Sequence, residues 1–207
     1  MKPKKKRKLW KKLLVILAAV ILVSGIGFGI YVQDYYRAND LALEAAAQSQ
    51  QDITVTTSSE GRIIFAPENP RAGLIFYPGG KVQYEAYAPL MEACAKEGIL
   101  CVLLRMPGNL AVLDINAAKG IPEEYPDIEN WYMAGHSLGG SMAASYINSH
   151  EEEFKSLILL AAYSTADLKE TGLKVLSLYG SEDGVLKMDS YEKYRDNLPE
   201  DFTEDLN

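Results

Sequence analysis

Histidine and cysteine are scarce in this chain, which has two of each among its 207 residues. Two cysteines exclude a disulfide-rich scaffold and a zinc or iron–sulfur site built from several cysteines. Two histidines leave too few ligands for an ordinary histidine-based metal centre. No motif in the sequence implies an organic cofactor either. We therefore expect a protein that works without a metal ion or cofactor.

Basic residues are scarce beyond the N-terminus. Residues 1–12 contain eight of the 21 Lys and Arg residues and no acid, which leaves 13 basic against 28 acidic residues and a net charge of −15 after Lys12. An acidic body of this kind argues against a broad nucleic-acid-binding surface. Hydrophobic residues make up 48% of the chain, which is typical of a globular protein. At this length one globular domain is the default expectation.

A long uncharged run follows the basic head at residues 1–12. As a helix, residues 13–32 would span about 30 Å, which is the thickness of the hydrocarbon core of a bilayer. Trp10 and Tyr35 flank the run, where aromatic belts of membrane helices lie. We interpret residues 13–33 as a single-pass signal-anchor helix in the cell membrane. The basic flank predicts a cytoplasmic N-terminus and an extracytoplasmic remainder.

A cleaved signal peptide is the alternative to the anchor. Small residues at Gly25-Ile26-Gly27 offer a weak cleavage site, and the protein would then be secreted. The apolar run is longer than the 7–15 residues typical of a signal peptide, which favours the anchor. The KPKKKRK run at residues 2–8 could also indicate nucleic-acid binding, but membrane topology already explains it.

The remaining sequence divides into a short connection and one domain. Residues 34–51 are Ala-rich and polar, and form either a helical stalk or a flexible linker. Residues 52–207 alternate strand-like and helix-like segments. We expect strands at residues 52–57, 62–66, 73–77, 99–104, 131–134, 157–160 and 173–178, and helices at 84–96, 110–118, 141–148 and 190–198. This alternation predicts an α/β protein with a mostly parallel sheet, whose ligands bind beyond the carboxyl ends of the strands.

The loop after the strand at residues 131–134 carries the strongest motif. It reads Gly135-His136-Ser137-Leu138-Gly139-Gly140 and matches Gly-x-Ser-x-Gly. In a sharp strand-to-helix turn this pattern lifts the serine hydroxyl clear of the backbone, which requires small neighbours. Ser137 is therefore a candidate nucleophile. The alternatives are an ordinary glycine-rich turn and a phosphate-binding loop, although a phosphate-binding loop normally continues with Gly-Lys-Ser/Thr.

Two other loops follow strands. The backbone N–H of Gly80 or Lys81 in YPGGK, together with that of Leu138, could form an oxyanion hole, because glycines let the backbone approach a ligand closely. Asp183 in GSEDGV, with Glu182 as the reserve, could orient an imidazole. The alternatives are a simple Pro-Gly turn and a solvated acidic turn.

Together these segments resemble a known family. FYPGGKV, MPGNLAVL, GHSLGG and LYGSEDGV are similar to the α/β-hydrolase superfamily, and most similar to its small, lidless, dienelactone-hydrolase-like branch in membrane-anchored bacterial form. The resemblance covers about residues 53–203. It implies Ser137 as nucleophile, Asp183 as triad acid, and an oxyanion hole from Leu138 with Gly80 or Lys81. A triad of this family runs in the order Ser, acid, His.

The chain departs from this pattern because no histidine follows Asp183. His136 should leave the turn and pack beside the sheet, and His150 would lie about 20 Å from Ser137 along one helix. The resemblance therefore implies a C-terminally truncated hydrolase without its last strand and helix. We expect low stability and almost no activity. The alternative is a non-catalytic remnant that serves as a membrane-anchored binding module.

The sequence also constrains the site that such an enzyme would have. Residues 161–172 leave no room for a lid, so an open site for small esters or lactones is expected, with a Ser137 acyl-enzyme. Cys94 and Cys101 are either buried free thiols or a disulfide. No oligomeric state is indicated.

Overall fold

The computed structural model describes residues 4–50 and 52–206. The first three residues of the basic head lie outside the described part. By its internal contacts the chain forms two compact units, Met1–Tyr35 and Tyr36–Asn207.

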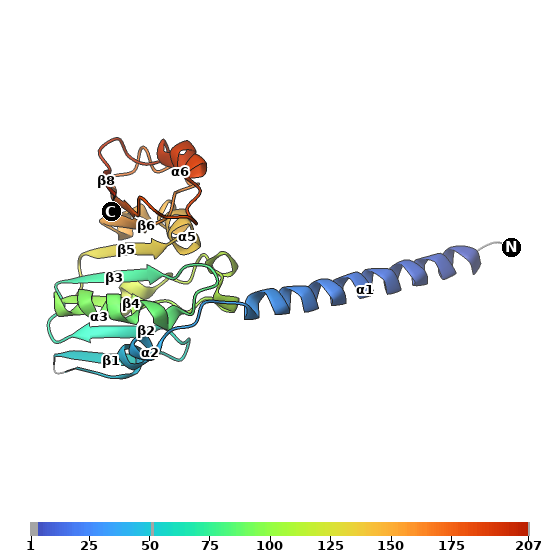
Figure 1. The fold of residues 1–207 in the computed structure, drawn as a ribbon, viewed down its shortest axis with the longest axis horizontal. Helices are drawn as coiled ribbons and strands as arrows, with labels where there is room; N and C mark the ends of the chain where they lie inside the picture. Colours follow the sequence, from blue (N-terminus) through green and yellow to red (C-terminus); the bar gives the residue numbers. More distant parts are fainter. Residues whose placement is uncertain (1–3, 51, 207) are drawn as a thin grey trace. The chain divides into compact units, whose positions relative to one another are not determined.

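The first unit is one long helix, α1 (Lys4–Gln33), drawn in blue in Figure 1. Its segment Leu9–Gln33 is 25 residues long, has a mean hydropathy of 2.8, and is not buried by other parts of the protein. This segment is therefore long and apolar enough to cross a membrane. A signal sequence near an N-terminus has the same length and composition, so α1 is compatible with both interpretations of residues 13–33.

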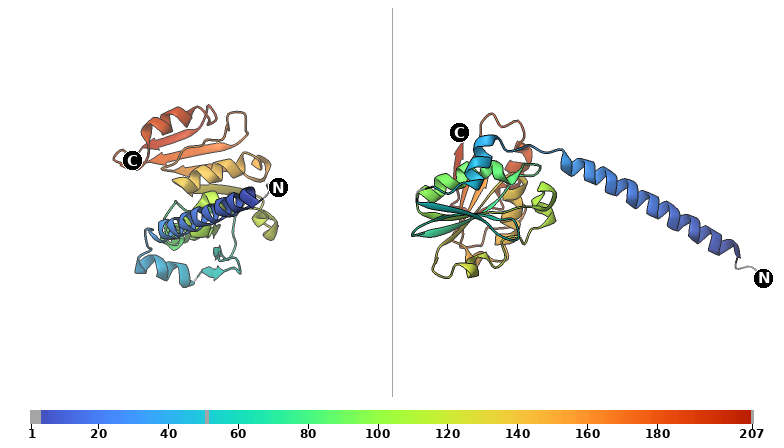
Figure 2. Two further views of the ribbon diagram at one scale, coloured as in Figure 1. Left: turned by 90° about the vertical axis from the view of Figure 1, so that its right-hand side faces the viewer. Right: turned by 90° about the horizontal axis from the view of Figure 1, so that it is seen from below.

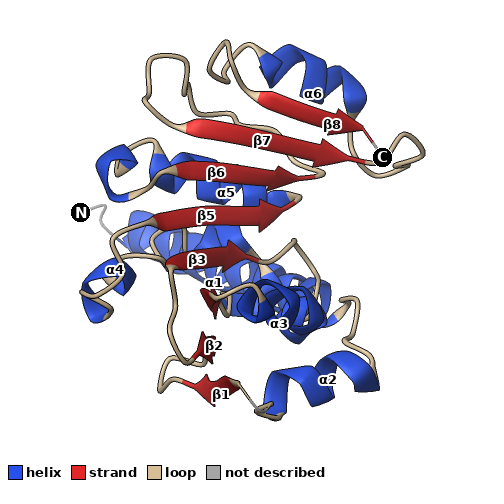
Figure 3. Ribbon diagram, turned by 90° about the vertical axis from the view of Figure 1, so that its left-hand side faces the viewer, coloured by secondary structure: helices blue, strands red, loops and turns tan. Residues whose placement is uncertain are grey.

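The second unit is built on an eight-stranded sheet in the order β1-β2-β4-β3-β5-β6-β7-β8 (Figure 3). Its strands are β1 (Ile53–Thr57), β2 (Ile63–Pro67), β3 (Ala72–Tyr77), β4 (Ile99–Leu103), β5 (Trp131–His136), β6 (Ser156–Leu160), β7 (Lys174–Tyr179) and β8 (Thr203–Leu206). The β1–β2 and β2–β4 pairs are antiparallel, and every other pair is parallel. The structure thus confirms the predicted α/β class with a mostly parallel sheet.

Helices cover both faces of this sheet (Figure 2). They are α2 (Asp40–Ala47), α3 (Ala88–Lys96), α4 (Ile121–Glu124), α5 (Leu138–Ile147) and α6 (Met188–Arg195). Strand β3 shows why both faces are apolar. Ile75 and Tyr77 belong to the core that contains α5, whereas Leu74 and Phe76 belong to the core that contains α3. A strand buried on both faces needs a continuous apolar run, which is what GLIFY provides.

The order of the strands in the sheet determines where the loops of the candidate site lie. The chain leaves β3 to form β4 on one side and later returns to form β5 on the other. The connections therefore diverge at β3, and in sheets of this kind ligands bind beyond the carboxyl ends of the strands at such a point. The loop at residues 77–81 and the elbow at Ser137 follow these two strands directly.

Two helix predictions need correction. The segment 110–118 forms turns and a short 3₁₀ helix at Ala111–Leu113 rather than a longer helix. Gly108 and Asn109, just before it, have φ angles of 57° and 56°, and such left-handed residues interrupt helical structure. The segment 84–96 begins as a 3₁₀ helix at Tyr84–Tyr87 and becomes α-helical only from Ala88.

The segment predicted as a stalk or linker packs onto the domain. Asn39 caps α2 by accepting the Ala42 N–H at 2.9 Å. Ala42 and Ala46 are buried, and α2 lies against α3. Small alanine side chains allow this close approach between the two helices. The globular unit therefore begins at Tyr36, ahead of the predicted start at residue 52.

The last strand, which the resemblance implies to be missing, is present as the short strand β8. Thr203–Leu206 pairs in parallel with β7, so β7 does not form the edge of the sheet. Tyr191 of α6 links the two strands, because its hydroxyl is 2.8 Å from Ser177 Oγ and donates to Glu204 Oε1 at 2.6 Å. Ser177 and Tyr191 are both buried, so this link lies in the interior.

We expect Tyr191→Phe to lower the free energy of unfolding by about 1–3 kcal/mol, because it leaves the buried Ser177 hydroxyl without this partner. Urea unfolding of the full chain in detergent measures the change. The matched control is Tyr194→Phe, whose hydroxyl lies 3.5 Å from the exposed Lys193 ammonium. Equal effects of the two substitutions would contradict the assignment.

Candidate active site

The turn at Ser137 has the strand–turn–helix geometry predicted for its motif. Strand β5 ends at His136, helix α5 begins at Leu138, and Ser137 between them has φ 50° and ψ −123°. Non-glycine residues rarely adopt such a backbone, and strain of this kind is concentrated at functional sites. The Ser137 N–H donates to the Leu160 carbonyl of β6 at 2.9 Å, which anchors the turn to the sheet.

Glycines around Ser137 make this turn possible. A Cβ atom at Gly135 would lie 2.6 Å from the Gly140 nitrogen, and one at Gly139 would lie 2.3 Å from the Pro78 carbonyl oxygen. Both distances are far below van der Waals contact. The structure thus confirms that this turn requires small neighbouring residues. The lack of a side chain at Gly139 also allows α5 to approach the loop at residues 77–81 closely.

That loop meets the residue after Ser137. A Cβ atom at Gly80 would lie 2.9 Å from Leu138 Cδ2, so the backbone of Gly80 lies directly against Leu138. The sequence leaves open whether Gly80 or Lys81 supplies an oxyanion donor. The Lys81 N–H donates to the Asn109 carbonyl at 2.8 Å. Since that hydrogen is already used, Gly80 is the better candidate of the two.

A strap from the start of the globular unit, residues 36–38, holds the same loop. The Tyr36 N–H donates to the Lys81 carbonyl at 2.8 Å, and the Gln83 N–H donates to the Tyr36 carbonyl at 2.9 Å. The Ala38 N–H adds a bond to Gln83 Oε1 at 3.1 Å. Sequence reasoning misses the strap, because no local pattern reveals a hydrogen bond between residues 45 positions apart.

Tyr87 joins the loop to the elbow. Its hydroxyl accepts the Gly79 N–H at 3.0 Å and lies 2.8 Å from His136 Nδ1. Since the tyrosine oxygen accepts from Gly79, its own hydrogen can be donated to a neutral His136. Burial raises the pKa of Tyr87 to about 12 and lowers the pKa of His136, so both groups are neutral near pH 7. His136 thus packs against Tyr87 and holds the loop, a role that the sequence does not reveal.

The loop after β7 brings Asp183 into electrostatic reach of the elbow. Asp183 Oδ1 accepts the N–H groups of Val185 at 2.8 Å and Leu186 at 2.9 Å, and these bonds lower the pKa of the carboxyl group. A smaller contribution comes from His136, whose pKa is in turn raised by the Asp183 charge. Glu182 is exposed and makes neither of these bonds, so Asp183 is the better placed of the two acids.

The second histidine lies at the other end of the helix that Ser137 begins. His150 Nδ1 is 2.8 Å from the Tyr146 carbonyl oxygen, and its ring stacks on Tyr146 at 4.1 Å between centroids. The ten residues of α5 separate it from the elbow, about 15 Å at 1.5 Å per residue. In the described part of the chain, no group of three His, Cys, Asp or Glu side chains could hold a metal ion.

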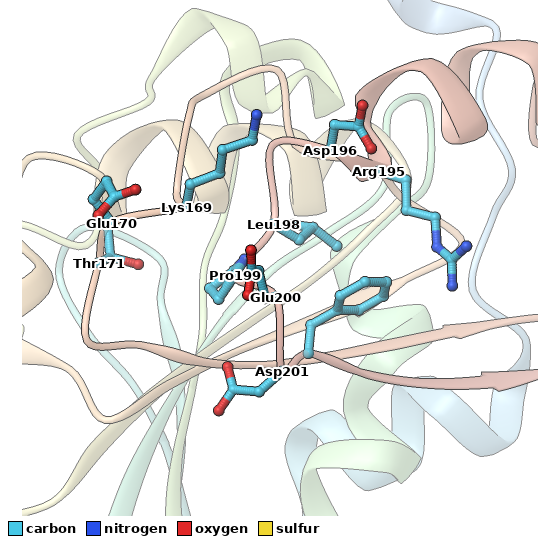
Figure 4. Close-up of a pocket in the computed structure, with 10 residues that line it drawn as sticks. Lys169, Glu170, Thr171, Arg195, Asp196, Leu198, Pro199, Glu200 and Asp201 are labelled. Carbon is cyan, nitrogen blue, oxygen red and sulfur yellow. The ribbon is translucent and has the colours of Figure 1, made fainter.

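A large cavity lies elsewhere in the domain. It has a volume of about 920 Å³ and is lined by residues that precede β7 and β8, among them Lys169, Arg195 and Asp201 (Figure 4). These residues lie at the amino ends of the strands, whereas Ser137 follows the carboxyl end of β5. The cavity is therefore separate from the candidate active site.

Residues 73–205, more than half of the chain, match the model of a family described as an alpha/beta hydrolase family. The chain belongs to the α/β-hydrolase family. The matched region contains the elbow, the loop at residues 77–81 and Asp183. None of the curated protein sequences matches the chain significantly.

Solved structures share the fold of this α/β-hydrolase. TT1662 from Thermus thermophilus superposes with a TM-score of 0.62 at 16% identity, over 75% of this chain and 88% of its own. A dienelactone hydrolase from Anabaena variabilis gives 0.61 at 13% identity, over 75% and 85%. The carboxylesterase CesB from Bacillus subtilis gives 0.59 at 12% identity, over 81% and 87%. At these identities the similarity establishes the fold alone.

We expect Tyr87→Phe to lower the free energy of unfolding of this α/β-hydrolase by about 1–3 kcal/mol, because the Gly79 N–H and His136 Nδ1 both lose a partner. Urea unfolding gives the change. Tyr132→Phe, which removes the same atom from a partly exposed tyrosine of β5, is the control and should change stability little. A similar loss in both variants would show that the Tyr87 hydroxyl has no special role.

The lowered pKa of His136 also predicts a pH dependence. Because folding lowers this pKa, the unfolded chain binds the proton more readily, so His136 lowers the free energy of unfolding as the pH falls below its ordinary pKa of about 6.5. The decrease should continue until the pH reaches the lower pKa of the folded state. His136→Asn, whose amide oxygen can still accept from Tyr87, should remove this contribution. Urea unfolding of both proteins between pH 7.5 and 5 tests it; parallel curves would refute the prediction.

Proposed function

We propose that this α/β-hydrolase is a serine carboxylesterase or lactonase that acts on small esters through an acyl-enzyme on Ser137. The observation that carries the proposal is the Ser137 backbone, held at φ 50° directly beside the Gly80 loop. A hydroxyl raised on such a turn, next to two backbone N–H donors, is the arrangement that acyl transfer needs. The fold similarity to a dienelactone hydrolase and a carboxylesterase supports the same class.

The reaction would follow from this placement. Ser137 Oγ attacks the ester carbonyl, and the N–H groups of Leu138 and Gly80 donate to the oxyanion that forms. One donor of this kind is worth about 10²–10³ in kcat. The Ser137 proton passes to water, the C–O bond to the leaving group breaks, and the alkoxide takes a proton from water and leaves as the alcohol. A second water molecule then hydrolyses the acyl-enzyme to the acid and regenerates the Ser137 hydroxyl. The strap at residues 36–38 and Tyr87 keep the Gly80 loop in position, so the donors need little reorganisation during the reaction.

The two histidines of the chain are poorly placed to accept the Ser137 proton. His136 Nδ1 is engaged by Tyr87, and His150 lies at the far end of α5. Without a general base, Ser137 is a poor nucleophile near neutral pH. Loss of the triad histidine costs about 10⁶ in kcat in serine proteases and leaves about 10³–10⁴ over water. We therefore propose weak turnover for this chain.

The substrate and location complete the proposal. Only residues 161–173 separate β6 from β7, so nothing large covers the site at that position and a small ester or lactone fits best. We propose that α1 anchors the enzyme in the cell membrane, with a cytoplasmic N-terminus and the hydrolase unit outside; secretion after signal cleavage is the alternative. The engagement of His136 by Tyr87 favours a second candidate function, a membrane-anchored binding module that keeps the fold without catalysis.

A fluorophosphonate probe tests the nucleophile on the full chain in detergent. We expect slow labelling of Ser137, accelerated by added imidazole by about tenfold or more, a part of the 10²–10⁴-fold that a positioned general base supplies. Ser137→Ala should abolish labelling. Asp183→Asn should weaken the acceleration by imidazole, because the acid would no longer stabilise an imidazolium.

Ser141→Ala is the matched control, since its hydroxyl donates to the Tyr163 carbonyl at 2.7 Å and is not part of the proposed site. It should label like the unchanged chain. Labelling that survives Ser137→Ala would contradict the proposal. A folded chain, judged by circular dichroism, that remains unlabelled with imidazole would favour the binding module.

A further inference from the structure

The two cysteines of the chain lie on neighbouring elements of one core. Cys94 is on α3 and Cys101 on β4, and α3 packs against β4. Cys101 is fully buried, whereas Cys94 is half-buried and packs against the core cluster that contains Cys101. Each of the two thiols shifts the pKa of the other. Cys94 is thus partly exposed to solvent, and Cys101 lies in the buried core against which Cys94 packs.

We propose that Cys94 and Cys101 form a redox-active pair, which small-molecule disulfides convert by thiol–disulfide exchange into an internal disulfide that joins α3 to β4. The proposal is independent of the hydrolase function. It requires only the positions of the two sulfurs and the access that solvent has to Cys94.

The two sulfurs differ in reactivity. The hydrogen bond from Cys101 lowers the pKa of Cys94 to about 7, so a large share of Cys94 is thiolate near neutral pH. The same interaction, together with burial, raises the pKa of Cys101. The same S–H can instead donate to the Ile99 carbonyl at 3.4 Å, so Cys101 has to turn away from this carbonyl when it donates to the Cys94 thiolate. Because the thiolate is the nucleophile in exchange, Cys94 reacts first and Cys101 second.

The exchange balances with an external disulfide as the oxidant. The Cys94 thiolate attacks one sulfur of that disulfide, a mixed disulfide forms, and the first small thiolate leaves and takes a proton from water. Cys101 loses its proton to water, attacks the Cys94 sulfur and expels the second small thiolate. Two protein thiols are oxidised by two electrons, and one small disulfide is reduced to two thiols.

An internal disulfide would act on the helix that follows Tyr87. The 3₁₀ helix Tyr84–Tyr87 leads directly into α3, and Tyr87 holds Gly79 and His136. A covalent bond between Cys94 and Cys101 would tie α3, which begins directly after Tyr87, to strand β4 of the sheet. The oxidised and reduced forms should therefore differ in how firmly the Gly80 loop is held.

Intact-mass spectrometry of the reduced full chain in detergent, during exposure to oxidised glutathione, tests the pair. We expect a transient adduct of one glutathione, followed by a product that has lost two hydrogens and carries a Cys94–Cys101 cross-link on peptide mapping. The first step should level off above a pH of about 7, where Cys94 is already ionised.

Two variants separate the roles of the sulfurs. Cys101→Ser should stop at a stable glutathione adduct on Cys94, and Cys94→Ser should leave the buried Cys101 unmodified while the chain stays folded. In Cys101→Ala the midpoint of the pH profile should move up, because Cys94 loses its hydrogen-bond donor. If a variant does not fold, the mass spectra of the unchanged chain still test the proposal. Two thiols that remain free, or a mixed disulfide that never resolves, would overturn the proposal.

Discussion

The close approach of the helix α5 to the loop at residues 77–81 is the constraint on which the rest of the domain depends. No side chain fits between Gly139 and the Pro78 carbonyl, so the first turn of α5 lies directly on the backbone after β3. This contact fixes Ser137 and Gly80 relative to each other. It also requires β3 and β5 to be neighbours, which the order of the sheet provides. The positions of the central strands and of the proposed chemistry are therefore set by the same few backbone atoms.

The central part of the fold follows from local sequence patterns. Residues 73–77 are apolar without interruption because β3 is buried on both faces. The GHSLGG motif can be recognised because the glycines that the sharp turn requires all lie within six residues. Both patterns are short and self-contained. Asp183 is likewise recognisable from its place between a strand and glycines. Its advantage over Glu182, however, comes from the N–H groups of Val185 and Leu186, which only the folded loop presents.

The parts that sequence reasoning misses depend on contacts between distant segments. The Lys81 N–H is excluded as an oxyanion donor by Asn109, which lies in a different loop. From the sequence alone, the Ala-rich segment that forms α2 is interpreted as a stalk or linker, because its packing against α3 is not visible in a local pattern. From the sequence, residues 203–206 are interpreted as the beginning of a strand that is otherwise missing. In the structure, Tyr191 and the β7 backbone hold these residues in the sheet. In each case the partner lies outside the window in which a local pattern can be recognised.

The strap at residues 36–38 sets the N-terminal limit of a globular unit in which the Gly80 loop keeps all its backbone partners. Proteolysis within the apolar helix, for example at the small residues Gly25–Gly29, would release a protein that still carries Tyr36 and therefore a fully supported Gly80 loop. A fragment that starts at residue 52 would contain all eight strands and the elbow, yet it would lack the backbone partners of Lys81 and Gln83. Cleavage that separates the globular unit from α1 and cleavage that removes the support of the Gly80 loop are thus only a few residues of chain apart.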